Sequence, residues 1–105
     1  MKNLILETKG IDTIVKLYEN RIEYVRTGLG GLLTYGSSGT KIISLKSITA
    51  IQFLKDSFIQ FAFVGSQESK AGFWAASKDE NTIMFSKKQN ADFERIRDYI
   101  IENFL

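Results

Sequence analysis

The closest approach to a recognisable chemical motif in this chain is a run of five glycines between residues 27 and 40. A phosphate-binding loop has the pattern G-x-x-x-x-G-K-[ST] and leads into a helix, whose N-terminus helps to bind the phosphate. Gly31 and Gly36 have this separation, but Ser37 replaces the lysine and a strand pattern follows. The dinucleotide pattern G-x-G-x-x-G also fails, because Leu33 stands at its third glycine position. We therefore interpret the run as a flexible connection between strands and expect no cofactor.

The ionisable side chains offer little for catalysis. The chain contains neither His nor Cys, and so lacks the commonest metal ligands, the usual general base and every thiol nucleophile. Glycoside hydrolysis needs two carboxyl groups that flank a cleft. The acids weighed for this role all fall in predicted turns: Glu19, Asp56, Asp79 and Glu80. We expect no catalytic residue, no metal site, no enzyme activity and no small-molecule substrate.

Basic residues are spread along the chain rather than grouped. Fourteen Lys and Arg against twelve Asp and Glu give a net charge of +2, so we expect no nucleic-acid partner. Arg26, Lys41 and Lys46, together with Lys16 and Arg21, fall near strand ends. These residues either gather into a basic rim or act as edge guards that prevent strands of different molecules from pairing.

Length and composition predict one domain over residues 1–105. Two cores would each be too small to offset chain entropy, whereas 44% apolar residues suffice for a single core. No apolar stretch approaches the roughly 20 residues that span a bilayer. Lys2 precedes only three apolar residues before Glu7, which is too short for a signal-peptide core. We expect a cytoplasmic protein.

Alternating apolar and polar residues predict a mainly β fold. Glu19-Asn20 separates two alternating segments, as in a tight hairpin, and places Val15 with Leu17, and Ile22 with Tyr24, on single faces. In a later strand Ile59, Phe61 and Phe63 are the better core candidates than the opposite set. The seven predicted strands span 13–18, 21–26, 41–45, 48–54, 58–64, 72–76 and 82–86.

One helix is predicted, over about residues 90–104. Its helical spacing is carried by Phe93, Ile96, Arg97, Ile100, Ile101 and Phe104. Asn90 is expected to cap it. A single apolar helix after a series of strands is suited to cover the open end of a small barrel or of two bent sheets.

The glycine-rich run also contains large apolar residues, Leu29, Leu32, Leu33 and Tyr35, which we call the apolar flap. Such residues seek burial, so the flap either packs onto its own domain or awaits a partner. Phe73 and Trp74 are neighbours and would point to opposite faces of a strand. An outward Trp74 would anchor a partner or stack on a base.

Three segments carry a resemblance to a known family: Gly28-Leu-Gly-Gly-Leu-Leu-Thr-Tyr-Gly36, Gly39-Thr-Lys-Ile-Ile-Ser-Leu45 and Lys78-Asp-Glu-Asn-Thr-Ile-Met-Phe85. From about residue 10 to the end, the chain resembles the small pleckstrin-homology-like (PH-like) domains of unknown function found in Gram-positive bacteria and their phages. The resemblance implies a seven-stranded PH-like barrel, made of two bent antiparallel sheets and capped by the helix. It also implies a tendency toward self-association and no established catalytic residues.

The chain departs from the phosphoinositide-binding members of the wider superfamily. They use a long basic loop between their first two strands, where several cations converge on one head group. In this chain that connection is Glu19-Asn20, so specific inositol-phosphate binding there is not expected.

Three functional hypotheses follow. The leading one is a non-catalytic binding or scaffold domain that contacts a protein partner, including another copy of itself, through the apolar flap, Trp74 and an exposed strand edge. The alternative is peripheral membrane binding, in which the flap enters the interface while Arg26, Lys41 and Lys46 meet anionic head groups. The third hypothesis, binding of single-stranded nucleic acid, has less support than the other two, because basic and aromatic residues do not interleave.

Overall fold

The computed structural model describes residues 3–27, 40–63 and 81–105, and this part of the chain is mainly β with one C-terminal α-helix. Its seven strands are β1 (Leu4–Gly10), β2 (Thr13–Tyr18), β3 (Arg21–Arg26), β4 (Thr40–Ser44), β5 (Ile48–Leu54), β6 (Phe58–Phe63) and β7 (Thr82–Met84). Two short 3-10 helices, η1 (Leu45–Ser47) and η2 (Lys87–Gln89), precede β5 and the helix α3 (Asn90–Phe104), respectively.

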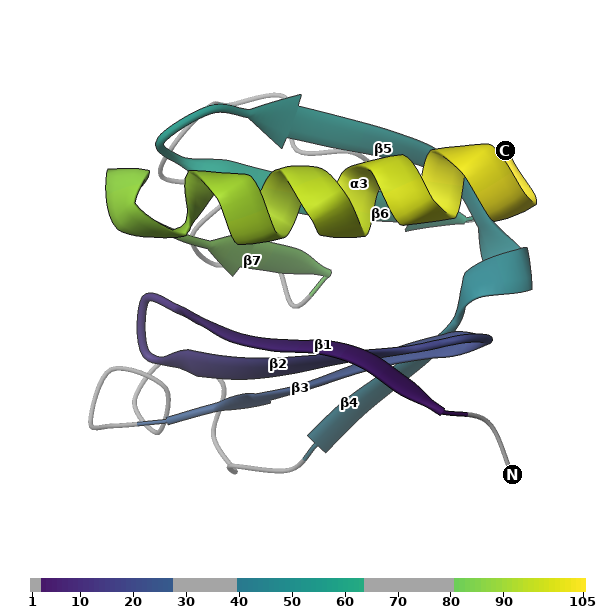
Figure 1. Cartoon of the computed structure of the whole chain (residues 1–105), viewed down its shortest axis with the longest axis horizontal. Coiled ribbons are helices and arrows are strands. Elements are labelled where there is room, and N and C mark those ends of the chain that lie inside the picture. The colour runs from purple at the N-terminus through teal and green to yellow at the C-terminus, as the bar shows by residue number, and fades with distance from the viewer. Residues whose placement is uncertain (1–2, 28–39, 64–80) are drawn as a thin grey trace.

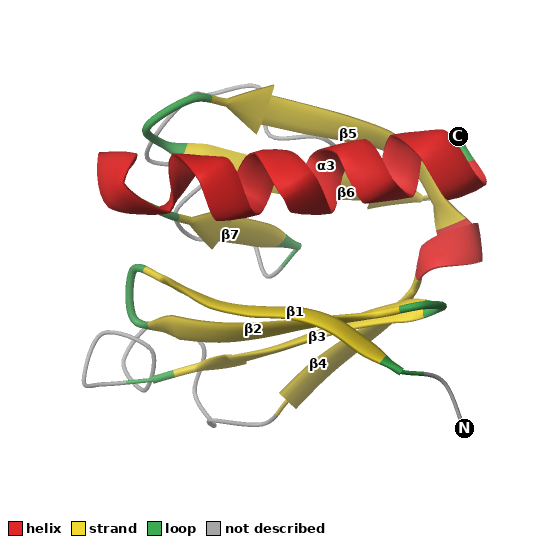
Figure 2. Ribbon diagram, viewed as in Figure 1, coloured by secondary structure: helices red, strands yellow, loops and turns green. Residues whose placement is uncertain are grey.

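The strands form two antiparallel sheets, which lie one above the other in Figure 1. The first sheet has the order β1-β2-β3-β4, and the second has the order β5-β6-β7. The short helix η1 joins the sheets at one end, and α3 runs along their open side, as the colouring by secondary structure in Figure 2 makes clear. Among the described strands, no strand of one sheet pairs with a strand of the other, so these strands form no closed barrel.

The predicted hairpin forms with the predicted bounds and faces. Val15 pairs with Tyr24, and Leu17 pairs with Ile22, across β2 and β3. All four side chains are buried. Strict alternation therefore fixes which face of the first sheet is directed inward, since a shift of one residue would expose this whole set.

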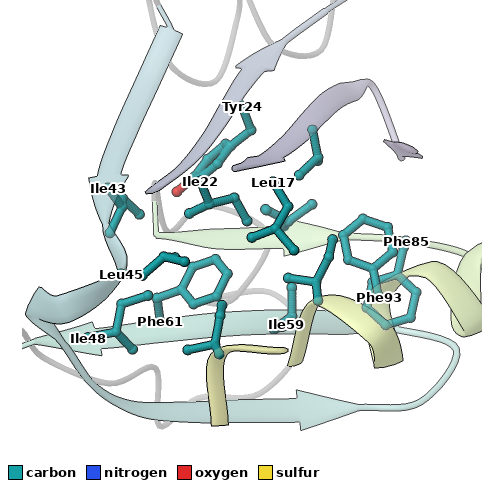
Figure 3. Packing of buried hydrophobic residues seen from close by; sticks show 14 residues of the cluster. Leu17, Ile22, Tyr24, Ile43, Leu45, Ile48, Ile59, Phe61, Phe85 and Phe93 are labelled. Carbon is teal, nitrogen blue, oxygen red and sulfur yellow. The ribbon is translucent and has the colours of Figure 1, made fainter. Parts of the chain in front are cut away.

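The larger of two buried apolar clusters among the described residues lies between the two sheets and α3 (Figure 3). The prediction of core residues in β6 is confirmed for Ile59 and Phe61, while Phe63 is only partly buried. Phe58 and Gln60, on the opposite face of β6, are buried as well, so this strand is covered on both sides where it begins. Phe85, which follows β7, stacks on Phe93 of α3, with their ring centroids 4.4 Å apart.

The prediction of the helix is confirmed, and its inner face is formed by Phe93, Ile96 and Ile100. Polar contacts hold both halves of α3. In its first turn Asp92 Oδ2 accepts a hydrogen bond from the Thr8 hydroxyl at 2.7 Å, and in its second half the Tyr99 hydroxyl donates to the Glu19 carbonyl at 2.8 Å. The helix is thus attached to β1 and to the turn between β2 and β3, far away in sequence.

At the corner opposite η1, the end of β1 meets β7. The Ile11 N–H donates to the Met84 carbonyl at 2.8 Å. The backbones approach so closely that a Cβ atom at Gly10 would lie 2.3 Å from the Met84 carbonyl oxygen. Only a residue without a side chain fits here.

The strand β1 was not predicted from the sequence. Its first residues, Leu4, Ile5 and Leu6, are three consecutive apolar residues without alternation. The pairing with β2 shifts register between Leu4 and Leu6, which is the irregularity of a β-bulge. A bulge interrupts the period of two on which recognition of a strand depends.

Smaller differences concern the ends of elements. The strand predicted over 41–45 spans 40–44, because Leu45 begins η1, and the one predicted over 82–86 ends at Met84.

The predicted helix cap is wrong: Asn90 has helical backbone angles, and its side chain forms a hydrogen bond with Asp56 in the β5–β6 turn instead. The capping box is made one turn earlier, by Ser86 and Gln89. The strand predicted over 72–76 lies outside the described residues.

Candidate interaction surface

Several residues expected to form the site lie outside the described residues. These are the four residues of the apolar flap, Leu29, Leu32, Leu33 and Tyr35, together with Trp74. Asp79 and Glu80, two of the acids weighed and not expected to be catalytic, also lie outside the described residues. The basic residues predicted for a rim, and the strands that flank the flap in sequence, are described.

Arg26 lies on the inner face of the first sheet and not on a solvent-exposed rim. Only 9% of the surface of Arg26 is exposed to solvent. The guanidinium donates from Nη1 to the Thr13 hydroxyl at 3.2 Å and from Nη2 to the Thr82 carbonyl, and it lies 5.2 Å from the centre of the Tyr24 ring. Arg26 therefore joins the end of β3 to the beginning of β7. The alternation Ile22, Tyr24, Arg26 is the sequence signal that places it inward.

Lys41 and Lys46 lie apart from each other. Lys41 pairs with Tyr24 in the β3–β4 ladder, on the inward side, and is half-buried. Lys46 is exposed in η1, beside Leu45, whose N–H donates to the carbonyl of Asn20 in the β2–β3 turn. Arg26 lies at the opposite end of β3, five residues from Arg21, which corresponds to roughly 17 Å along a strand. The three cations do not converge on one head-group site.

The outer face of the first sheet carries charges in register with charges of opposite sign. Lys16 lies between Glu7 of β1 and Glu23 of β3 in the strand pairing. Arg21 Nε lies 2.5 Å from Glu23 Oε2, and its guanidinium also stacks 3.9 Å above the Tyr18 ring. This face is therefore close to electrically neutral where it approaches β4.

Strand β4 is the last of the described strands in the first sheet, and it exposes a large apolar side chain. Ile42 is 60% exposed, the highest exposed fraction among the large apolar residues described. Thr40 and Ser44 lie on the same face as Ile42 and are exposed too, while Ile43 points inward and is buried. We call the outward set Thr40, Ile42 and Ser44 the β4 edge patch.

A groove runs between β1 and the second half of α3. Its volume is about 210 Å³. Ile5, Leu6 and Leu17 line it from the sheet, and Arg95, Asp98, Tyr99 and Glu102 line it from the helix. A smaller hollow of about 90 Å³ on the outer face of the first sheet includes Ile14, Lys16, Val25 and Thr40. Both are smaller than the roughly 300–1,000 Å³ of a typical small-molecule pocket.

Within the described ranges, no three acidic side chains gather as metal ligands would. No helix in these ranges is both long enough and apolar enough to cross a membrane. Comparison of the chain with protein-family models, with curated proteins and with solved structures gave no match.

Proposed function

We propose that this chain is a non-catalytic binding or scaffold domain that makes protein–protein contacts, including contacts with its own copies. The observation that carries the proposal is the β4 edge patch, where Ile42 is exposed on the last of the described strands of the first sheet. Burial of such a large apolar side chain against a protein partner removes apolar surface from water and so favours association.

We further propose that the fold is PH-like. Three features support this finer assignment: a four-stranded sheet followed by a three-stranded one, a link through η1 at one corner with a β1–β7 contact at the other, and a C-terminal helix on the open side. The resemblance of the sequence to small bacterial and phage PH-like domains agrees with these features.

The apolar flap belongs to the same proposal on sequence grounds. It lies between β3 and β4 in the chain, so it is followed directly by the strand that carries the β4 edge patch. Burial of each large apolar side chain contributes roughly 1.5–3 kcal/mol, which favours coverage of the flap by the domain or by a partner. We propose that Leu29, Leu32, Leu33 or Tyr35 crosses the interface between copies.

The membrane hypothesis receives less support from the geometry. Of its three cations, Arg26 is buried against β7, and Lys46 lies at the opposite end of β3. Attraction to anionic lipids contributes about 1 kcal/mol for each basic residue near the surface, so cations that do not face the same surface contribute less together.

Sedimentation equilibrium from micromolar concentration upward tests the proposal. We expect a mass that rises above that of the monomer, and a double variant of the flap, Leu32→Asp with Leu33→Asp, that has a lower mass and an unchanged circular dichroism spectrum. A wild-type monomer at every concentration would refute self-association. Salt-sensitive binding of that monomer to phosphatidylserine vesicles, lost in the double variant, would then favour the membrane hypothesis.

A further inference from the structure

We infer that the groove between β1 and α3 is the contact surface of a two-fold symmetric dimer, in which the α3 helices of two copies lie antiparallel and each helps to cover the groove of the other. This inference rests on the proposed self-association, and its partner is a second copy of this chain. The surface is separate from the apolar flap and from the β4 edge patch, so this contact can be tested without them.

The first observation is the apolar floor of the groove. Ile5 and Leu6 of β1 line it and are only partly buried against the main core. Leu4, which precedes them in β1, is 48% exposed. Coverage of this strand by a protein surface would remove apolar groups from water, which favours association.

The second observation is the pattern of charge on the helix side of the groove. Arg95 and Glu102 both line the groove, and both are exposed. They are seven residues apart, so they lie on the same side of α3, separated by about two turns or roughly 10.5 Å along its axis. Neither forms an ion pair with any residue that the structure describes. The helix side therefore offers one positive and one negative charge to a partner.

The third observation is that this pattern is complementary to itself. In an isologous contact, residue i of one copy meets residue j of the other, and j meets i. Two antiparallel α3 helices centred between Asp98 and Tyr99 place Arg95 of each copy opposite Glu102 of the other. A parallel arrangement would instead bring Arg95 to Arg95 and Glu102 to Glu102. Charge complementarity therefore favours a second copy and fixes the direction of its helix.

The centre of the contact is compatible with this symmetry. Asp98 is the charged residue nearest to the two-fold axis, where it approaches its own copy. Its Oδ1 accepts a hydrogen bond from Arg97 Nε at 2.9 Å within the same chain, and this positive charge offsets the repulsion between the two carboxylates. The Tyr99 hydroxyl donates to the Glu19 carbonyl at 2.8 Å, which holds the second half of α3 in place beside the groove.

The absence of cysteine from the chain permits a direct test. Asp98→Cys introduces a single thiol beside the two-fold axis. Ala91→Cys is the matched control, because Ala91 is exposed on the same side of α3 two turns earlier. In the antiparallel dimer the two copies of Ala91 are about 22 Å apart along the helices, whereas a disulfide spans Cα atoms roughly 4.4–6.8 Å apart.

Under mild oxidation we expect the Asp98→Cys protein to form a disulfide-linked dimer at least tenfold faster than the Ala91→Cys protein. Equal rates would overturn the assignment. Faster linkage of the Ala91→Cys protein would overturn it too, because that result requires the helices to meet in another arrangement.

Charge reversal provides the second test. It is made in the Leu32→Asp, Leu33→Asp background, which removes any contact through the apolar flap, and we expect this parent to remain a dimer. Arg95→Glu and Glu102→Arg each place like charges opposite one another, so each should reduce the parent to a monomer. An equimolar mixture of the two proteins should regain the dimer, and so should one protein that carries both changes. Circular dichroism shows whether each variant keeps its helix.

The outcomes of the second test are distinct. Recovery in the mixture supports the contact, since mixing cannot repair a fold that a substitution has damaged. If the wild type associates but the parent is monomeric, or if neither reversal lowers the mass of the parent, the groove contact is wrong while the proposed function stands. A wild type that is monomeric at every concentration overturns both.

Discussion

The hydroxyl of Thr8 donates a 2.7 Å hydrogen bond to Asp92 Oδ2, across 84 positions of sequence. Thr8 is buried on the inner side of β1, and Asp92 lies in the first turn of α3. A carboxylate at this position also interacts favourably with the helix dipole. The contact links the strand that was hardest to predict to the helix that was easiest, and it defines where α3 begins to cover the sheets.

We predict that the inner face of α3 dominates stability. Replacement of Ile96 or Ile100 by Ala should lower the free energy of unfolding by about 2–5 kcal/mol, because both side chains are fully buried between the sheets. Ile101, which is 45% exposed on the same helix, provides the control, and its replacement by Ala should cost less than about 1 kcal/mol. Urea unfolding measures all three. Removal of residues 90–105 should give an aggregated or unfolded protein, and a truncated chain that melts cooperatively would contradict a role for the helix in closing the core.

We predict that Gly10→Ala lowers the stability of the protein although it adds only one methyl group. The added methyl group would meet the Met84 carbonyl oxygen at 2.3 Å, and because that atom belongs to the backbone, β1 and β7 must move apart. Overpacking of this kind typically costs about 1–3 kcal/mol. Thermal denaturation of Gly10→Ala beside Lys9→Ala, an exposed neighbour, is the comparison. Equal melting temperatures would show that the corner is not tightly packed.

We predict that Arg26 acts in folding and not in lipid binding. Arg26→Met keeps much of the apolar volume but removes the donors to the Thr13 hydroxyl and the Thr82 carbonyl, which should lower stability by about 1–3 kcal/mol. Lys46→Met, at an exposed position, should leave stability within about 0.5 kcal/mol of the wild type. Chemical denaturation measures both. A stable Arg26→Met protein that had lost binding to phosphatidylserine vesicles would reverse this assignment.

We predict no hydrolase or transferase activity. The chain offers no imidazole and no thiol. Asp56, one of the acids in predicted turns, accepts a hydrogen bond from the Asn90 side chain, while its N–H donates to Asn90 Oδ1 at 2.9 Å. General esterase, phosphatase and glycosidase substrates should show background turnover. Turnover that disappears in Asp56→Asn or Glu80→Gln would contradict this prediction.

The sequence predicted the elements whose side chains follow a regular period. The β2–β3 hairpin and α3 have their expected bounds, because Val15, Leu17, Ile22 and Tyr24 alternate and the helix repeats its apolar residues every three or four positions. β1 was missed because a bulge breaks its alternation. The last predicted strand was extended through Phe85, which in the structure follows β7 and stacks on Phe93 of α3. Short-range periodicity carries no information on such tertiary contacts.

The candidate site was harder to predict than the fold. Charge alone suggested a rim for Arg26, although its alternation with Ile22 and Tyr24 indicates an inward position. Its partner Thr82 is 56 positions away, so the contact itself could not be predicted from local sequence. Ile42 was not singled out, because an isoleucine in an apolar strand usually faces a core. Its exposure follows from the pairing of β4 with β3, which places it beside Glu23 on the outer face.

The contact between Thr8 and Asp92 also bears on how the domain acquires its structure. β1 and α3 complete the same core, so the early hairpins emerge from the ribosome before the helix that covers their apolar face is available. Until α3 is synthesised, Leu17, Ile22 and their neighbours remain exposed to water or to chaperones. Domains with such sequence-distant contacts fold in milliseconds to seconds rather than microseconds. The core can therefore be completed only once residues 90–104 have been synthesised.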